Sequence, residues 1–194
     1  MRTPHLFLVP ALLCSLAACT PVQTSINEQN QNPLTASRYG DELADTMANF
    51  IISDDPIVKD PATLKLIESE IARGKDIGTS AREIVGDGLL GGIISIKADV
   101  MGYALLADNV LYLSSDFISD PGASLHVYLT TVVDPRDVSF PDETAIDLGS
   151  LQATYGPQQY DVPVQDDPNA IRSFVLYDTK LKIIYGFAQI SKSA

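Results

Sequence analysis

Few side chains in this sequence can act as nucleophiles, general bases or soft-metal ligands. The chain of 194 residues holds two cysteines, Cys14 and Cys19, and two histidines, His5 and His126. These counts exclude a four-thiolate zinc or iron–sulfur site and a site built from several histidines. The sequence also lacks the GxSxG, HExxH, P-loop and GxGxxG motifs, each of which serves a known chemistry. The residues therefore favour a protein that is not an enzyme.

His126 is the one histidine outside the N-terminal segment. Its imidazole would suit a haem or metal ligand or a general base, and a Ser–His–Asp triad would have to use it. A single histidine without a second histidine or a cysteine makes a poor soft-metal site. Because His126 and Tyr128 alternate with Leu125, Val127 and Leu129, we expect a strand with its histidine on the face opposite the leucines. The favoured interpretation is a partly buried residue beside Tyr128 with one hydrogen bond.

Carboxylates are the most abundant groups that could bind a ligand. Between residues 116 and 167 there are ten acidic residues and one basic residue, Arg136. Loops rich in carboxylates can hold Ca²⁺ through side-chain and backbone oxygens. The spacing matches no EF-hand, so the favoured interpretation is a solvated anionic surface, with Ca²⁺ as the alternative. No other cofactor is predicted.

The overall charge restricts the partners of the chain. There are 13 basic and 25 acidic side chains, giving a net charge of −12. Nucleic acid is excluded as a partner, because its phosphates require basic patches. Attraction to anionic lipid is disfavoured for the same reason.

The first 18 residues, MRTPHLFLVPALLCSLAA, indicate a signal peptide. Arg2 supplies a positive start, and the apolar stretch from Leu6 to Leu16 is too short to span a bilayer. Leu16-Ala17-Ala18-Cys19 resembles a bacterial lipobox, which implies cleavage before Cys19 and its acylation. Palmitate-type chains added there would anchor the protein in the lipid bilayer, because two or three chains bind firmly. The alternative is an ordinary secretory signal.

The resemblance to a lipobox also implies a location. Thr20, not an aspartate, follows Cys19, which favours the outer membrane of a bacterial cell envelope, with the protein facing the periplasm. Cleavage would leave a mature chain with no free thiol, one histidine, 12 basic side chains and 25 acidic ones. Its net charge would be −13.

The elements that must position these residues fall into three consecutive segments. Residues 19–36 are rich in Gln, Asn, Thr and Ser and predict a flexible tether. Residues 37–87 predict two or three short helices, since Leu43, Met47 and Phe50 recur at helical spacing. Their apolar faces are expected to dock on the domain that follows. That domain, residues 88–194, predicts an antiparallel β-sandwich or barrel, so the fold class is mainly β within an α+β chain.

Local signals set the expected element boundaries. Asp60 and Pro61 suit the start of a helix, and Gly74 suits its end. Ser80 and Glu83 have the spacing of a capping box for a third helix. Asp108-Asn109 predicts a tight turn between two strands. The strand segments are expected at 93–98, 101–107, 110–114, 125–133, 145–150, 159–164, 172–178 and 181–190.

Four stretches of the C-terminal half follow one another in the order and spacing of a known family. They are GYALLADNVLYLSSDF from Gly102, DPGASLHVYL from Asp120, LGSL with GPQQYDVP from Leu148, and SFVLYD with IYGFA from Ser173. Together they resemble the DM13 domain, a small β-rich module of extracytoplasmic proteins, over about residues 92–191. The helical segment lies outside this resemblance.

The resemblance implies electron transfer or redox chemistry, which has been proposed for DM13 domains from a cysteine in their closing motif. Here Asp178, after Tyr177, holds that position, and Asp99 stands where the family often has a histidine. Because an aspartate cannot do thiol chemistry, we expect a DM13 fold without its thiol. Asp99 and Asp178 together could bind a hard cation or share a proton; the alternative is two solvated acids.

These inferences combine into one expectation and one alternative. We expect a membrane-anchored lipoprotein whose DM13-like domain is a non-catalytic binding or interaction module for a protein or a small molecule. The alternative is the electron-transfer module that the family implies. Tyr177 and the other strand tyrosines serve both ideas, because an aromatic ring can stack a ligand or carry an electron hole, although tyrosines more often cover the edge of a core.

Overall fold

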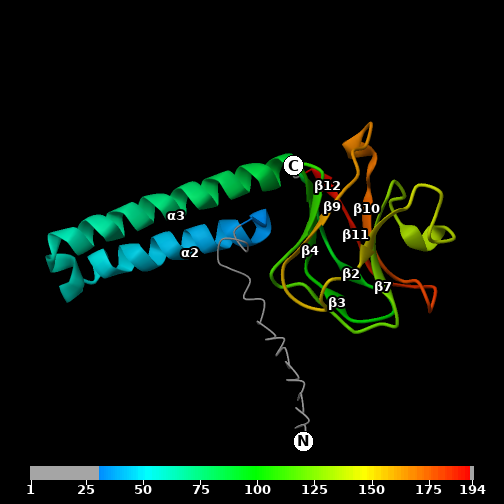
Figure 1. The fold of residues 1–194 in the computed structure, drawn as a ribbon, viewed down its shortest axis with the longest axis horizontal. Coiled ribbons are helices and arrows are strands. Elements are labelled where there is room, and N and C mark those ends of the chain that lie inside the picture. Colours follow the sequence, from blue (N-terminus) through cyan, green and yellow to red (C-terminus); the bar gives the residue numbers. More distant parts are fainter. Residues whose placement is uncertain (1–30, 193–194) are drawn as a thin grey trace, which may run out of the picture.

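The computed structural model describes residues 31–192, which form a helical hairpin followed by a β-sandwich (Figure 1). The expected signal peptide, Cys19 and most of the expected tether lie outside the described residues. Within the described residues, no helix combines the length and apolar character needed to cross a bilayer. The arrangement of two helices before antiparallel sheets confirms the α+β expectation.

The hairpin consists of α2 (Pro33–Ile52), the short 3-10 helix η1 (Pro56–Lys59) and α3 (Pro61–Asp87). Asn32 caps α2 by accepting a hydrogen bond from the Leu34 N–H at 3.0 Å, and Asp60 caps α3 by accepting one from the Thr63 N–H at 3.0 Å. A proline follows each cap, where its fixed φ suits the first helical turn. The start at Asp60 is confirmed. The tether expected to reach residue 36 is wrong at its end, because this capped helix begins at Pro33.

The helix α3 runs unbroken for 27 residues. The expected end at Gly74 and the expected third helix at Ser80 are therefore both wrong. Gly74 stays helical because the partner helix occupies the space of its missing side chain. A Cβ on Gly74 would lie 2.7 Å from the Gly40 carbonyl oxygen and 2.9 Å from the Ala44 nitrogen. Glycine is tolerated in mid-helix when such close packing offsets its poor helix propensity.

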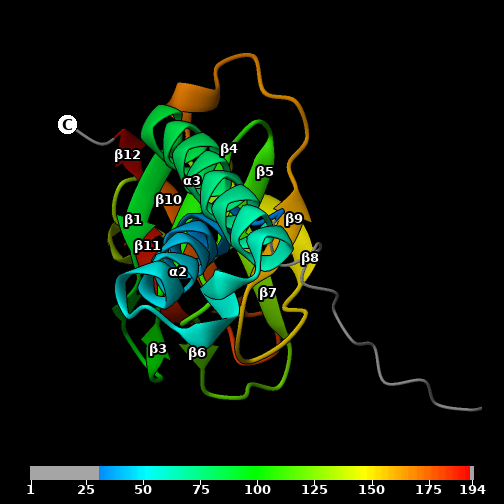
Figure 2. The same cartoon turned by 90° about the vertical axis from the view of Figure 1, so that its left-hand side faces the viewer.

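A seam of small residues joins the two helices. Its buried members are Ala36, Gly40, Ala44, Gly74, Gly78 and Ala81. The larger Ile67 is also buried, while Leu43, Met47 and Phe50 are partly buried. The helices thus pack mainly on each other, and the expectation that their apolar faces dock on the β-domain is wrong along most of their length. Figure 2, viewed from the hairpin side, shows both helices projecting from the sandwich toward the viewer.

Two five-stranded antiparallel sheets form the sandwich. The first contains, in spatial order, β12 (Ser191–Lys192), β1 (Leu89–Gly92), β4 (Tyr103–Ala107), β5 (Val110–Leu113) and β9 (Gln158–Asp161). The second contains β2 (Ile94–Ser95), β11 (Ile183–Gln189), β10 (Ser173–Asp178), β7 (Leu125–Thr130) and β8 (Ile146–Ser150). A separate pair is formed by β3 (Val100–Met101) and β6 (Ile118–Ser119). Every strand segment expected from the sequence overlaps one of these strands.

The core lies between the two sheets. Leu111 and Leu113 of the first sheet meet Val127, Leu129 and other inward residues of the second in one buried cluster. Asp108 and Asn109 join β4 to β5 with φ values of +50° and +59°, which confirms the tight turn and its positive-φ geometry. Strand β7 places Leu125, Val127 and Leu129 in the core and His126 and Tyr128 on the outer face, as the alternation predicts.

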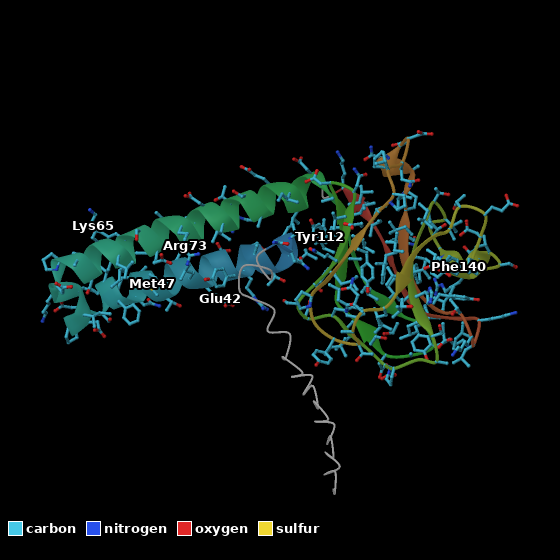
Figure 3. The ribbon with its side chains drawn as sticks, in the orientation of Figure 1. Glu42, Met47, Lys65, Arg73, Tyr112 and Phe140 are labelled. Carbon is cyan, nitrogen blue, oxygen red and sulfur yellow. The ribbon has the colours of Figure 1, made fainter. Side chains whose placement is uncertain are left out.

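The hairpin touches the sandwich only near its base. The Asn32 side-chain amide donates to the Leu113 carbonyl oxygen at 2.7 Å. Leu105, on the face of β4 that points away from the core, is fully buried there, and Gly88 lies directly against it. Tyr112 lies on this hairpin side of the sandwich (Figure 3). The second sheet is therefore the layer remote from the helices, and its outer face carries the candidate site.

Candidate functional site

Three aromatic rings gather on the outer face of the second sheet. Tyr128 of β7, Tyr177 of β10 and Phe140 of the β7–β8 loop form this aromatic cluster. The ring centroids of Tyr128 and Tyr177 are 6.0 Å apart, and those of Phe140 lie 5.4 and 5.2 Å from them. All three contacts are edge-to-face, the geometry that the ring quadrupoles favour. Val175 and Phe187 complete the buried patch beneath them.

The loop between β7 and β8, residues 131–145, covers this patch. It holds the short 3-10 helix η2 (Pro135–Asp137), which Asp134 caps. The guanidinium of Arg136 lies 5.2 Å from the centre of the Phe187 ring, a cation–π contact. Phe140 lies at the side of the sandwich remote from the hairpin (Figure 3). The loop thus adds both an aromatic ring and a cation to the face of the sheet.

A cleft of about 260 Å³ opens between this loop, the residues that follow β2 and the start of β11. Its walls are Phe140, Tyr177 and aliphatic side chains such as Ile96, Val138 and Ile184. Three basic residues line it as well, Lys97, Arg136 and Lys182, and none of its lining residues is acidic. We call it the cationic cleft. The lining of the cleft is therefore positive, although the chain as a whole has a net charge of −12.

The protonation states of the cleft follow from its surroundings. Hydrogen bonds from Arg136 hold the pKa of Asp134 below its ordinary value, so this ion pair persists at neutral pH. Burial raises the pKa of Tyr177. Burial and the nearby Asp147 carboxylate raise the pKa of Tyr128 to about 12. Both phenols therefore stay neutral, Asp134 balances the charge of Arg136, and Lys97 and Lys182 supply the net positive charge of the cleft.

Asp178 ends β10 as a buried carboxylate and lies away from solvent. Its Oδ2 accepts hydrogen bonds from the Ala123 and Ser124 N–H groups at 2.7 and 3.2 Å. Its Oδ1 accepts from Lys180 and Leu181 at 3.0 and 2.9 Å. Burial raises the pKa of Asp178, but these four backbone donors lower it, and the net pKa lies below the ordinary value. Asp178 thus ties the β6–β7 loop to the turn between β10 and β11.

Asp99 and Asp178 do not form a shared site in the structure. Asp99 is exposed before β3, where its backbone N–H donates to the Asp120 carboxylate at 3.1 Å. Both oxygens of Asp178 are already occupied by backbone donors. Across residues 31–192 no group of three or more His, Cys, Asp or Glu side chains is arranged to hold a metal ion.

His126 is the one expected site residue that lies among polar side chains. Its Nδ1 is 3.0 Å from Asp147 Oδ2, and its Nε2 is 3.3 Å from Ser150 Oγ. Its ring also stacks on Tyr128 at 6.4 Å. The expectation of a partly buried histidine beside Tyr128 is confirmed. The expectation of a single hydrogen bond is wrong, because two neighbours on β8 flank the ring.

A β-bulge brings these neighbours together. His126 pairs with Ser150, and Tyr128 pairs with Asp147. Between these two pairs β8 advances by three residues, whereas β7 advances by two. Gly149 supplies the extra step with φ of +101°, a conformation that glycine adopts without strain. In a regular strand, residues three apart point to opposite faces, and the bulge restores them to the same face. Asp147 and Ser150 therefore both reach the imidazole.

Sequence reasoning missed most of these partners. The sequence pattern did not predict that Asp147 and Ser150 lie together, because residues three apart point to opposite faces of an ideal strand. Gly149 between them was the one local sign of a bulge. Lys97, Arg136 and Lys182 come from three separate segments, and no periodicity links them. Their convergence depends on strand order, which the sequence pattern does not specify.

Comparison with known proteins identifies the sandwich. The family described as "Electron transfer DM13" matches residues 94–190, which are half of the chain and agree with the stretch expected at about 92–191. The match covers the second sheet and most of the first, and leaves the helical hairpin outside. No curated protein and no solved structure matches the chain. The chain therefore belongs to the DM13 family, which is associated with electron transfer.

Proposed function

We propose that this protein is a lipid-anchored lipoprotein of the bacterial envelope whose DM13 domain binds a ligand at a site that is itself non-catalytic. Its anchor is acylated Cys19, in the outer membrane and facing the periplasm. Its binding place is the cationic cleft, and its ligand is a small molecule that joins an anionic group to an apolar or aromatic body. The observation that carries the proposal is that Lys97, Arg136 and Lys182 line one cleft together with Phe140 and Tyr177.

The chemistry of the cleft supports this class of ligand. Ligand sites are typically apolar hollows with a few charged groups that fix orientation. Phe140, Tyr177 and Ile184 supply the apolar walls, and the cations supply the charge. Within the described residues, Lys97 and Lys182 belong to no ion pair, so both ammonium groups can meet an anion. The Arg136 guanidinium above Phe187 donates to Asp134 through Nε and Nη2, so the two lysines are the main partners for a ligand anion.

A fluorescent anionic aromatic probe, anilinonaphthalene sulfonate, tests the cleft. Its uncharged counterpart, N-phenylnaphthylamine, has the same rings without the charge. We expect the sulfonate to bind more tightly. The double variant Lys97→Ala with Lys182→Ala should weaken its binding about tenfold, the loss expected from two charge contacts of about 0.7 kcal/mol each. The double variant Lys59→Ala with Lys65→Ala removes the same charge from the hairpin and should have no effect. Equal weakening in both would contradict the proposal.

Anchoring is tested separately, by cell fractionation. Cys19→Ser removes the thiol to which lipid would be attached, so the protein should leave the outer-membrane fraction or remain unprocessed. Cys14→Ser is the matched control, because Cys14 leaves with the signal peptide and its variant should fractionate normally. Unchanged membrane association of Cys19→Ser would exclude the lipobox interpretation.

Electron transfer is a second candidate, favoured by the aromatic cluster and the family association. A thiol route is closed in the DM13 domain, since residues 94–190 contain no cysteine. Tyr128 and Tyr177 offer a different route, with neighbouring rings and the Asp147 carboxylate beside Tyr128 to accept the phenolic proton. Voltammetry of the soluble mature chain should then give a reversible wave that Tyr128→Phe shifts or removes. If the wild-type chain gives no wave, this candidate fails and the binding proposal is unaffected.

A further inference from the structure

Asp147, His126 and Ser150 stand in the order of a hydrogen-bonded relay. The Asp147 carboxylate contacts Nδ1 at 3.0 and 3.1 Å, and Ser150 Oγ lies 3.3 Å from Nε2. A carboxylate can only accept hydrogen bonds, so the contact with Asp147 favours the imidazole tautomer that carries its proton on Nδ1. Nε2 is then left as an acceptor that faces the Ser150 hydroxyl. This is the arrangement in which a histidine removes a proton from a serine.

The scaffold holds this relay in place. Asp147 also accepts a hydrogen bond from the Gly149 N–H at 2.8 Å, which fixes the carboxylate within the bulge. The His126 ring rests on Tyr128, itself packed in the aromatic cluster. The side chains of His126 and Asp147 keep 24% and 42% of their surface exposed, so the relay is ordered and still open to solvent.

A cavity adjoins the serine end of the relay. It has a volume of about 310 Å³ and includes Ser150 in its lining. The other lining residues are Pro121, Gly122, Ser124, Leu125, Leu151, Gln152, Ala153 and Thr154. None of them is charged, so the cavity suits an uncharged group. The cationic cleft shares no residue with it.

We propose that Ser150 is a nucleophile, activated by His126 and oriented through Asp147, that attacks uncharged carboxylic esters with short acyl chains. The acyl chain would occupy the cavity beside Ser150. This activity goes beyond the binding function proposed for the cationic cleft, because the two proposals depend on different residues.

The reaction divides into two balanced steps. In the first, Ser150 Oγ bonds to the carbonyl carbon while its proton passes to His126 Nε2. The ester C–O bond then breaks, and the leaving alcohol takes that proton. In the second, His126 removes a proton from water, the resulting oxygen attacks the acyl carbon, and Ser150 leaves with the proton. No metal or other co-reactant is needed.

Release of p-nitrophenolate from p-nitrophenyl butyrate by the full mature chain tests this. Ser150→Ala and His126→Gln should each lower the release by about a hundredfold, the usual contribution of a nucleophile or general base. His126 is partly buried and Ser150 is exposed, so the variants should melt as the wild type does. Ser191→Ala removes another exposed hydroxyl and should leave the rate unchanged.

A fluorophosphonate gives an independent readout of the same serine. Ser150 Oγ would bond to phosphorus, its proton would pass to His126, and fluoride would leave. The expected result is one adduct per chain, mapped to the peptide that contains Ser150 and absent in His126→Gln. A wild-type chain that releases no more p-nitrophenolate than Ser150→Ala, or an adduct that persists in His126→Gln, would overturn the proposal. Binding of the anionic probe in the cationic cleft would be unaffected by either result.

Discussion

Asp178 connects two loops through the four backbone hydrogen bonds of one carboxylate. The resemblance to DM13 domains implies that it takes the place of the cysteine on which their proposed redox role depends. Here the side chain is buried and its oxygens face the N–H groups of Ala123, Ser124, Lys180 and Leu181. A group so enclosed contributes to the structure and offers no free oxygen to a ligand.

Substitution of Asp178 should destabilise the fold in a pH-dependent way. Asp178→Asn keeps the shape but turns an NH₂ group toward backbone donors, so the melting temperature should fall at about pH 7. The folded pKa lies below the ordinary 3.8, so the carboxylate contributes stability above that value and loses it as pH falls through the folded pKa. The difference between wild type and variant should therefore shrink toward about pH 3. Melting curves measure this.

An exposed aspartate provides the control for that experiment. Asp99→Asn changes the same chemical group at the other position that the family resemblance singles out. Its side chain caps nothing in the structure, so its melting temperature should match that of the wild type at either pH. Equal effects of the two substitutions would show that the four hydrogen bonds of Asp178 contribute little.

At the scale of single elements, the helical hairpin depends on glycine for close packing. Gly74→Ala would bring a methyl group to within 2.7 Å of the Gly40 oxygen, so the helices must separate and the hairpin should lose stability. Gly86→Ala is the matched control in the same helix, with nothing within 4 Å of its new methyl. It should gain about 0.5–1 kcal/mol from better helix propensity. The loss of the helical circular dichroism signal on heating gives the melting temperature of each variant. A change in the same direction for both variants would contradict close packing at Gly74.

Gly74 also shows where sequence patterns lose information. A glycine that follows an apolar helical stripe predicts the end of the helix, because glycine has a poor helix propensity. Only contacts with a segment distant in the sequence can offset that loss of stability inside a helix. Gly40 lies 34 positions earlier, and periodicity within one helix does not reveal it. The same limit applies to Ser150, which reaches His126 only through a bulge. In contrast, Asp60, Asp108 and the alternation around His126 act locally, and those predictions are confirmed.

At the scale of the whole molecule, family resemblance and physical patterns predicted different things. The motif order predicted the boundaries of the sandwich to within a few residues, and the matched range is 94–190. The position of the hairpin was predicted wrongly, because an apolar stripe shows that a helix needs a partner but not which one. The partner of α2 is α3, so the apolar residues are shared between the two helices. Few apolar residues of either helix are therefore left to contact the β-domain.

The helical hairpin and the sandwich should unfold as two separate units. The hairpin buries mainly glycine and alanine, with Ile67 as its one large buried side chain, whereas the sandwich encloses a core that includes Phe117 and Phe174. Since stabilisation scales with the apolar area buried, the hairpin should unfold first. The full chain should then show two thermal transitions, the earlier one with loss of helical signal.

A shortened chain beginning at Gly88 separates the alternatives. It should fold and retain the second transition, at a somewhat lower temperature, because removal of the helices uncovers Leu105 and leaves the Leu113 carbonyl without the Asn32 amide. Substituting Asn32→Ala in the full chain should reproduce only part of that decrease. A single cooperative transition in the full chain, together with failure of the shortened chain to fold, would instead make the hairpin part of the folding unit of the sandwich. The contacts between the two parts are restricted to the base of the hairpin, which argues for two folding units.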